Sequence, residues 1–325
     1  MTMRSKLIVV VVAFGVLITA LVAYSLLSGG PPAGAVKAGF DTEFLDRPDG
    51  YPGLQKAYNF EFAERPMHLD PGLMYKAVHE KQVDVICAFM TDGRIEAFDL
   101  KVLDDDRGFF PPYDAAPLVR AETLEKHPQL REVLNRLGGK ISTARMRKLN
   151  YAHDRQEDSK SHRQIAHDFL VDEGLIDPDK KGDGSAGTIT VGGKNFTEQD
   201  IIGEMIAILI EHNTNIKVER KLGLGGTMLC FKPLQNGDLD LYAEYTGTGL
   251  MNILDRPVIK DSREAYDTVA REFKDRWDLI WLKPFGFNNA YTITMRREHA
   301  ERLGVETISD LAAHVRAGAG GPAGK

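Results

Sequence analysis

Cysteine is scarce in this chain, and its scarcity excludes several kinds of site. The 325 residues contain two cysteines, Cys87 and Cys230, and each lies in an apolar segment of a different half of the sequence. Buried thiols are a more common outcome in such segments than a disulfide between them, and neither cysteine has the spacing of a metal motif. The sequence therefore predicts no disulfide framework, no metal site and no cofactor.

An excess of positive charge is also missing. The formal net charge is −6, and no long block of lysine and arginine interrupts the sequence. Nucleic-acid-binding domains are usually basic, so we expect no nucleic-acid partner. The acidic run at residues 104–106 lacks the alternating ligands and the distant glutamate of a calcium loop, and we interpret it as a solvated turn.

The residue patterns of common catalytic sites are absent as well. His153, His162 and His167 lie among charged residues of a helical pattern, without a serine or a paired carboxylate nearby in the sequence. General acid–base and nucleophilic catalysis both need such partners. We therefore expect that the protein is not an enzyme.

One long hydrophobic run is present, at residues 7–27, and Arg4 and Lys6 precede it. About 20 apolar residues are enough to cross a bilayer, and flanking positive residues stay on the cytoplasmic side. We expect a transmembrane anchor here, a tether up to residue 35 and an extracytoplasmic body. Cleavage after residues 33–35 is the alternative, and the protein would then be secreted.

Two strand-like segments each end in an aromatic residue. Residues 83–89 end at Phe89, and residues 239–245 end at Tyr245, which small hydroxyl and glycine residues follow. Such a strand end commonly contributes to a ligand pocket in an open α/β sheet. The repeated pattern indicates two similar lobes that face one cleft, although two unrelated buried strands would explain it equally well.

Other segments predict the remaining organisation. Residues 36–40, 59–65 and 99–103 are strand candidates, and residues 121–170 have helical periodicity. Residues 177–187 are rich in glycine and aspartate and form the clearest internal linker.

Several polar or aromatic residues stand where a strand or turn ends. Lys194 follows a glycine turn and precedes a helix, which is a typical anion site. Arg47 lies beside the Pro-Asp-Gly turn, Tyr113 ends a rigid Phe-Phe-Pro-Pro-Tyr segment, and Tyr291 begins a strand after a polar turn. A solvated arginine and a loop that covers the core are the simpler interpretations of Arg47 and of the aromatic segment.

Taken together, these segments resemble the extracytoplasmic substrate-binding proteins of ABC importers for glycine betaine, choline and related osmoprotectants. The resemblance covers most of residues 36–318. It rests on the blocks GGKNFTEQDIIGEM, KLGLGGT, NGDLDLYAEYTGTG, PFGFNNAYTITM, FLDRPDGYPGL, DPGLMYKAV, VDVICAFMTDGRI, DDDRGFFPPYDAAPLVR and KLNYAHD. It implies an α/β fold of the two-lobed periplasmic-binding-protein type (type II, Venus-flytrap) and an ABC permease as partner.

The order of the blocks differs from that of the family, because the closing half comes first here. We interpret the chain as a circular permutant, with a tandem or fused product whose halves pair between chains as the alternative. We expect a split lobe formed by residues 36–99 and 283–325. Residues 100–282 would form a continuous lobe that contains the linker 177–187.

The resemblance also implies a ligand site. An aromatic cage would hold a quaternary ammonium group, and a second set of residues would hold the ligand's carboxylate. Phe89 departs from the family, which often has tyrosine there. The cage positions are Tyr245, Tyr291, Tyr113 and Phe89, and the carboxylate positions are Lys194, Thr248 and Arg47.

The implied function is capture of glycine betaine, choline or a similar compound for import. A ligand-binding sensor or orphan domain for a related trimethylammonium compound, such as carnitine or ergothioneine, is the alternative. If deletion of the protein abolished uptake of the ligand, import would be favoured over a sensor role. Turnover of choline or betaine by the pure protein would instead support the hypothesis that it is an enzyme.

Overall fold

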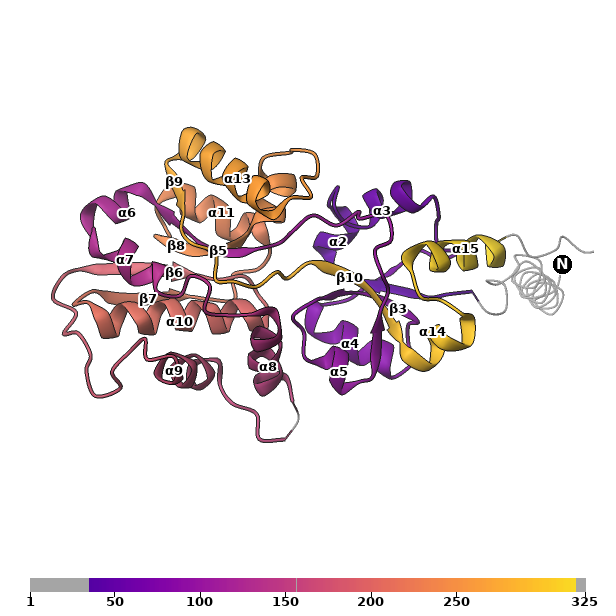
Figure 1. Ribbon diagram of the computed structural model, residues 1–325, viewed down its shortest axis with the longest axis horizontal. Helices are drawn as coiled ribbons and strands as arrows, with labels where there is room; N and C mark the ends of the chain where they lie inside the picture. Colours follow the sequence, from indigo (N-terminus) through magenta and orange to yellow (C-terminus); the bar gives the residue numbers. More distant parts are fainter. Residues whose placement is uncertain (1–34, 156, 320–325) are drawn as a thin grey trace, which may run out of the picture.

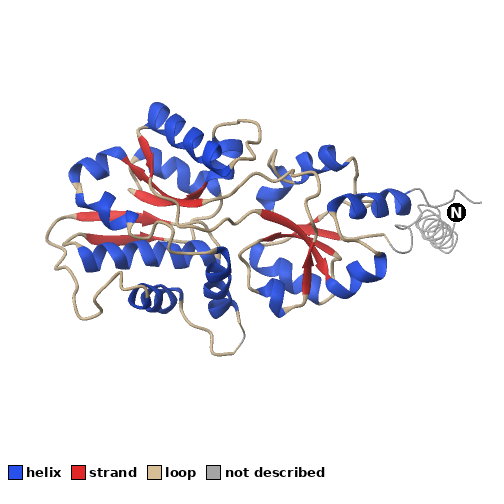
Figure 2. Ribbon diagram, in the orientation of Figure 1, coloured by secondary structure: helices blue, strands red, loops and turns tan. Residues whose placement is uncertain are grey.

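The computed structural model describes residues 35–155 and 157–319, which form two lobes (Figure 1). In this part of the chain each lobe has one five-stranded mixed sheet, with helices packed on both faces (Figure 2). The strand orders are β2-β1-β3-β10-β4 and β7-β6-β8-β5-β9. In both sheets the fourth strand is antiparallel to its two neighbours, so the lobes share one topology.

The first lobe is built from two separate stretches of chain. Its elements are β1 (Ala38–Phe40), α2 (Thr42–Asp46), α3 (Tyr51–Tyr58), β2 (Met67–His68), α4 (Pro71–His79), β3 (Val85–Phe89), α5 (Arg94–Ala97), β4 (Leu100–Val102), β10 (Tyr291–Arg296), α14 (Arg297–Leu303) and α15 (Ile308–Ala319).

The second lobe is continuous. Its elements are β5 (Ala115–Arg120), α6 (Ala121–Lys126), α7 (Gln129–Asn135), α8 (Thr143–Asp154), α9 (His162–Asp172), β6 (Thr188–Gly192), α10 (Thr197–Asn213), β7 (Lys217–Lys221), α11 (Thr227–Asn236), β8 (Leu241–Tyr245), α12 (Thr246–Thr248), the π-helix η1 (Gly249–Ile253), α13 (Ser262–Trp277) and β9 (Leu279–Trp281).

The second-lobe sheet is covered by helices of contrasting character. Helix α10 is the most buried: its residues Ile201 to Ile210 lie against the sheet and against α9, with all apolar side chains enclosed. Helix α13 is instead amphipathic, with Ala265, Val269 and Phe273 at fourfold spacing on its buried face. That spacing places one residue per turn on the same side of the helix, so these three side chains form the buried face of α13.

Two crossover segments, residues 103–114 and 282–290, connect the lobes and run side by side. Asp114 and Asn288 form an antiparallel bridge between them. The Asn289 amide donates to the Tyr113 carbonyl at 3.1 Å, and the Phe285 amide donates to the Ala115 carbonyl at 2.9 Å. The paired segments therefore form the narrow connection visible between the lobes in Figure 1.

Three expectations from the sequence differ from the structure or lie outside it. Strand β4 pairs with β10 in the first-lobe sheet, so an expected lobe boundary at residue 100 falls inside that sheet. Residues 59–65 form no strand; their alternating Phe60 and Phe62 instead pack against the ring of Tyr51. The expected membrane segment at residues 7–27 lies outside the described residues, within which no helix is long and apolar enough to span a bilayer.

Candidate ligand-binding site

The strands of both sheets bring their ends to the space between the lobes. Tyr291 begins β10 directly opposite Phe89, the last residue of the antiparallel strand β3. In the second lobe Tyr245 ends β8 opposite Ala115, the first residue of β5, so Tyr113 lies close by. Strands β10 and β5 run antiparallel to β3 and β8, so they begin at the edge of the sheet where β3 and β8 end. Tyr291, at the start of β10, and Tyr113, just before β5, therefore lie at these edges.

A cavity of about 350 Å³ lies between the lobes at these strand ends. All seven residues that the sequence singled out line it, together with eleven others that the sequence did not. The predicted residues in the cavity wall are Tyr245, Tyr291, Tyr113, Phe89, Arg47, Lys194 and Thr248.

Five aromatic rings from both lobes surround the cavity in an unbroken series of contacts. The Tyr113 ring meets the Tyr291 ring edge to face, with centroids 5.7 Å apart, and Tyr291 lies 5.2 Å from Phe89. Phe89 is parallel to Phe196 at 5.8 Å, and Phe196 lies 6.4 Å from Tyr245. Burial raises the pKa of the three tyrosines well above the usual value, so their phenols stay neutral.

Close packing at one glycine supports this arrangement. A Cβ atom on Gly247 would lie 2.8 Å from the Tyr113 ring and 2.9 Å from the Pro112 carbonyl oxygen. The loop after β8 can therefore approach the Phe-Phe-Pro-Pro-Tyr segment only with glycine at this position.

Arg47 is buried at the polar end of the cavity. Its Nε donates to Asp49 Oδ1 at 2.8 Å and its Nη2 donates to Asp49 Oδ2 at 2.5 Å. Tyr113 also donates its hydroxyl to Asp49, at 2.5 Å. Asp49 is fully enclosed, so the Pro-Asp-Gly turn supplies a buried counter-charge as well as a bend.

Lys194 lies on the other lobe with a second buried counter-charge. Its Nζ donates to Glu244 at 2.7 Å and to the Thr227 hydroxyl at 3.0 Å, and it stands 5.3 Å from the Tyr245 ring centroid. Glu244 is fully enclosed within β8. Both cations of the cavity wall are thus paired with carboxylates of the protein.

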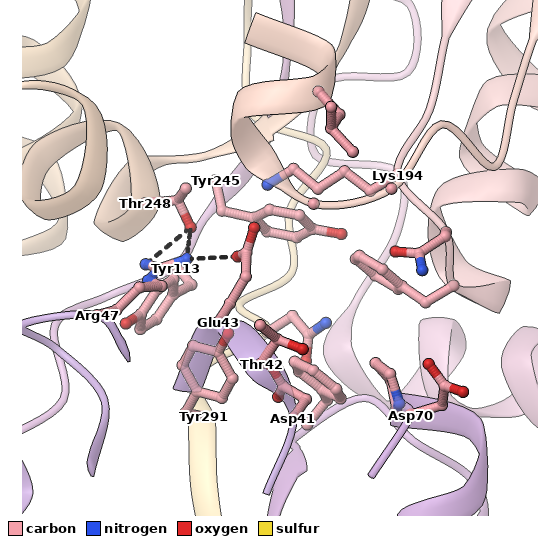
Figure 3. Close-up of a pocket in the computed structure, with 18 residues that line it drawn as sticks. Asp41, Thr42, Glu43, Arg47, Asp70, Tyr113, Lys194, Tyr245, Thr248 and Tyr291 are labelled. Atoms are coloured by element: carbon pink, nitrogen blue, oxygen red, sulfur yellow. Dashed lines mark hydrogen bonds and ion pairs between the residues drawn. The ribbon is translucent and has the colours of Figure 1, made fainter. Parts of the chain in front are cut away.

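Glu43 joins the two lobes across the cavity. It comes from α2 in the first lobe and accepts the Thr227 amide, at the start of α11 in the second lobe, at 2.5 Å. Its other oxygen accepts from Arg47 Nη1 at 3.1 Å, and Figure 3 shows the Glu43, Arg47 and Thr248 side chains pointing toward one another. A Cβ on Gly226 would lie 2.4 Å from the Glu43 carboxylate oxygen, so a side chain at this position would displace the carboxylate from the start of α11.

A second, more polar cavity of about 250 Å³ adjoins the first beyond Phe89 and Phe196. Its wall contains Glu198, which is 2% exposed and joins several segments. One oxygen accepts from Thr91 at 2.5 Å and Asn150 at 3.1 Å, and the other from Tyr245 at 2.8 Å and Asn289 at 2.9 Å. Burial raises the pKa of Glu198, and the four donors oppose that rise.

Sequence reasoning missed several residues of this site. Phe196 stands in the Lys-Asn-Phe-Thr-Glu-Gln block beside Lys194, so an aromatic residue at a helix start was an available signal. Glu43, Glu198 and Asn289 had no such signal, because their roles depend on partners that are distant in the sequence.

Two lobes of one topology, a paired crossover and a cavity between the strand ends define a two-lobed binding protein of the periplasmic type. The sequence model of the "Substrate binding domain of ABC-type glycine betaine transport system" matches residues 27–172 and 187–324. The chain therefore belongs to this family, whose members are extracytoplasmic substrate-binding domains rather than catalysts.

Individual relatives match shorter parts of the chain. The carnitine transport binding protein OpuCC of Listeria monocytogenes is 49% identical over 119 residues, 36% of this chain and 38% of that protein. The glycine-betaine-binding protein of Pseudomonas aeruginosa is 34% identical over 147 residues, 45% of this chain and 47% of that protein. The chain thus spans less than half the length of each of these relatives.

Solved structures of similar proteins include a glycine betaine/carnitine/choline ABC transporter protein. It is 38% identical, with 43% of this chain and 50% of that chain covered and a TM-score of 0.34.

Proposed function

We propose that the protein is the substrate-binding component of an ABC importer and that it captures a quaternary ammonium osmoprotectant between its lobes. The observation that carries this proposal is the series of aromatic rings, drawn from both lobes, around one cavity. A quaternary ammonium group has no N–H to donate, so ring faces recognise it, at roughly 0.5–2 kcal/mol per contact. Several such contacts can together support micromolar affinity, about −8 kcal/mol.

Ligand binding favours closure of the lobes on this proposal. Tyr291 and Phe89 belong to the first lobe, and Tyr245 and Phe196 belong to the second. A ligand that contacts both pairs is bound more tightly by the closed arrangement, and it shifts the equilibrium toward that arrangement. The closed form is then available to a permease partner.

The chain order is proposed to be a circular permutation of the family order. Support comes from the family match, which consists of two segments separated at residues 173–186, in the region of the expected linker 177–187. The hydrogen bonds that link the two parts of the first lobe, such as Arg296 Nη1 to the Val83 carbonyl at 2.7 Å, support closure within one chain.

We also propose an extracytoplasmic location, with residues 7–27 as a membrane tether. The apolar composition of this run and the preceding Arg4 and Lys6 support the orientation.

The test is calorimetric titration of the full-length chain, purified in detergent, with choline, glycine betaine and carnitine. Saturable one-to-one binding of any of them is the expected result. A protein that melts cooperatively and binds none of the three would overturn the proposed function.

A further inference from the structure

The polar end of the cavity has an arginine whose hydrogen-bonding capacity is already used. A guanidinium group has five N–H donors. In Arg47 they make five hydrogen bonds: two to Asp49, one to Glu43 and two to the Thr248 hydroxyl, the last at 3.3 and 3.4 Å. Each N–H group of Arg47 thus has an acceptor within the protein, and the two bonds to Thr248 are longer than the usual range of about 2.7–3.2 Å.

Glu43 occupies the place where an anionic ligand group would bind. The start of a helix such as α11 attracts anions through its free amides. Here the Thr227 amide and hydroxyl, at 2.5 and 3.2 Å, and Arg47 Nη1, at 3.1 Å, all donate to the Glu43 carboxylate. Burial alone would raise the pKa of Glu43, but Lys194 and Arg47 hold it below its usual range, so this carboxylate is charged at neutral pH.

The charges around the cavity also favour a ligand that has a positive charge and no carboxylate. Three carboxyl groups, those of Asp41, Glu43 and Asp70, line the cavity with two cations, Arg47 and Lys194. Behind the cations lie the enclosed carboxylates of Asp49 and Glu244. A group with full positive charge is attracted by this arrangement, whereas a carboxylate on the same ligand would be repelled by Glu43.

We propose that the cavity selects a quaternary ammonium compound without a carboxylate, such as a trimethylammonium alcohol, and that Glu43 is the residue that excludes zwitterions. Glu43 keeps 30% of its side-chain surface exposed, so one of its oxygens can accept a hydrogen bond from a ligand hydroxyl. This inference rests on the proposed function and narrows its ligand class. It also gives Arg47 a different role, because Arg47 then holds Glu43 and Asp49 in place rather than the ligand.

The first test compares choline with glycine betaine by calorimetric titration of the full-length chain at one pH and ionic strength. Choline is expected to bind at least tenfold more tightly. Equal or tighter binding of glycine betaine would overturn the inference and leave the proposed function standing. Failure of both ligands to bind would also overturn the inference, and the proposed function itself would be overturned if carnitine failed to bind as well.

The second test changes Glu43 and follows the ratio of the two dissociation constants. Glu43→Gln removes the negative charge at nearly constant shape, and the preference for choline is expected to fall at least tenfold. Glu64→Gln, an exposed site in the same lobe, is the matched control and should leave the ratio unchanged. If Glu43→Gln weakens both ligands equally or changes neither, Glu43 does not determine specificity.

A third variant protects the test against misfolding. Glu43→Ala opens the anion site and leaves the Thr227 amide and one Arg47 N–H free. It is expected to shift the ratio toward glycine betaine at least as far as Glu43→Gln does. The wild-type comparison of the two ligands decides the ligand class even if both variants unfold.

Discussion

Replacement of Glu198 by glutamine provides a severe test of the structure, because one carboxylate holds three parts of the molecule together. Its partners are Thr91 in the first lobe, Asn289 in the crossover, and Asn150 and Tyr245 in the second lobe. All four donate, so the site requires an acceptor at both oxygens. A glutamine amide keeps one oxygen and turns the other position into a donor.

The size of the effect follows from that mismatch. Two of the four donors would then face an N–H group instead of an oxygen. A buried donor left without an acceptor costs about 1–3 kcal/mol, so the loss of two acceptors in Glu198→Gln should destabilise the native protein by roughly 2–6 kcal/mol. Thr91 alone of the four partners belongs to the first lobe, so loss of its bond weakens closure in particular.

Thermal unfolding and calorimetric titration measure the two consequences separately. Glu198→Gln should lower the melting temperature and, if the Thr91 bond is lost, weaken ligand binding by about tenfold, which corresponds to 1.4 kcal/mol. Glu132→Gln, at an exposed position of α7, is the control. Wild-type melting and wild-type affinity in Glu198→Gln would refute the assigned hydrogen-bond network.

Three further outcomes are expected. Tyr291→Ala should weaken choline binding by about tenfold or more, because one ring face is lost; unchanged affinity in calorimetry would remove this ring from the cage. Gly226→Ala should push Glu43 away from α11 and open the lobes, which small-angle X-ray scattering would detect as a larger radius of gyration; an unchanged radius would count against this contact as a closure element. Burial lowers the pKa of His162 to about 4, so the unfolded state takes up a proton first as the pH falls. The contribution of His162 to native stability should therefore decline between about pH 6.5 and 4, and His162→Gln should differ from wild type by lacking this decline over that interval; equal slopes would contradict the lowered pKa.

The residues that line the cavity could be predicted from the sequence when a local pattern marks a strand end. Phe89 and Tyr245 close apolar runs, Tyr291 starts one, and Lys194 follows a glycine turn. Such positions converge in an open α/β sheet whatever the order of the strands. The local sequence pattern is therefore enough to predict that these residues lie at the cavity, whereas the contacts between their rings depend on the fold.

Strand β5 shows what a local pattern cannot reveal. It lies between β8 and β9 as an interior strand of its sheet, yet Pro117 stands within it. Proline donates no amide and normally argues against a central strand. Here its carbonyl still accepts from the Leu282 amide at 2.9 Å, so the ladder loses only one donor.

The charged partners of Arg47 and Glu43 could not be predicted from the sequence either. Arg47 beside a turn predicts a solvated charge or a ligand contact, and neither interpretation anticipates a buried bond to Asp49 two residues away. Glu43 and Thr227 are 184 positions apart. Contacts of this kind arise from the packing of two lobes, and no spacing in the chain encodes them.

The proposed circular permutation would be compatible with an intact site, because the join that it implies lies away from the cavity. The linker 177–187 leads into the first residue of β6, where the Gly187 carbonyl accepts from the Lys217 amide at 2.9 Å. Strand β6 has five residues and is about 16 Å long at the usual rise per residue, and Lys194 lies beyond its far end. The start of β1 is likewise the end opposite Asp41 and Glu43. Strand ends, not chain ends, build the cavity, so exchanging the order of the halves leaves each side chain on the same edge of the same sheet.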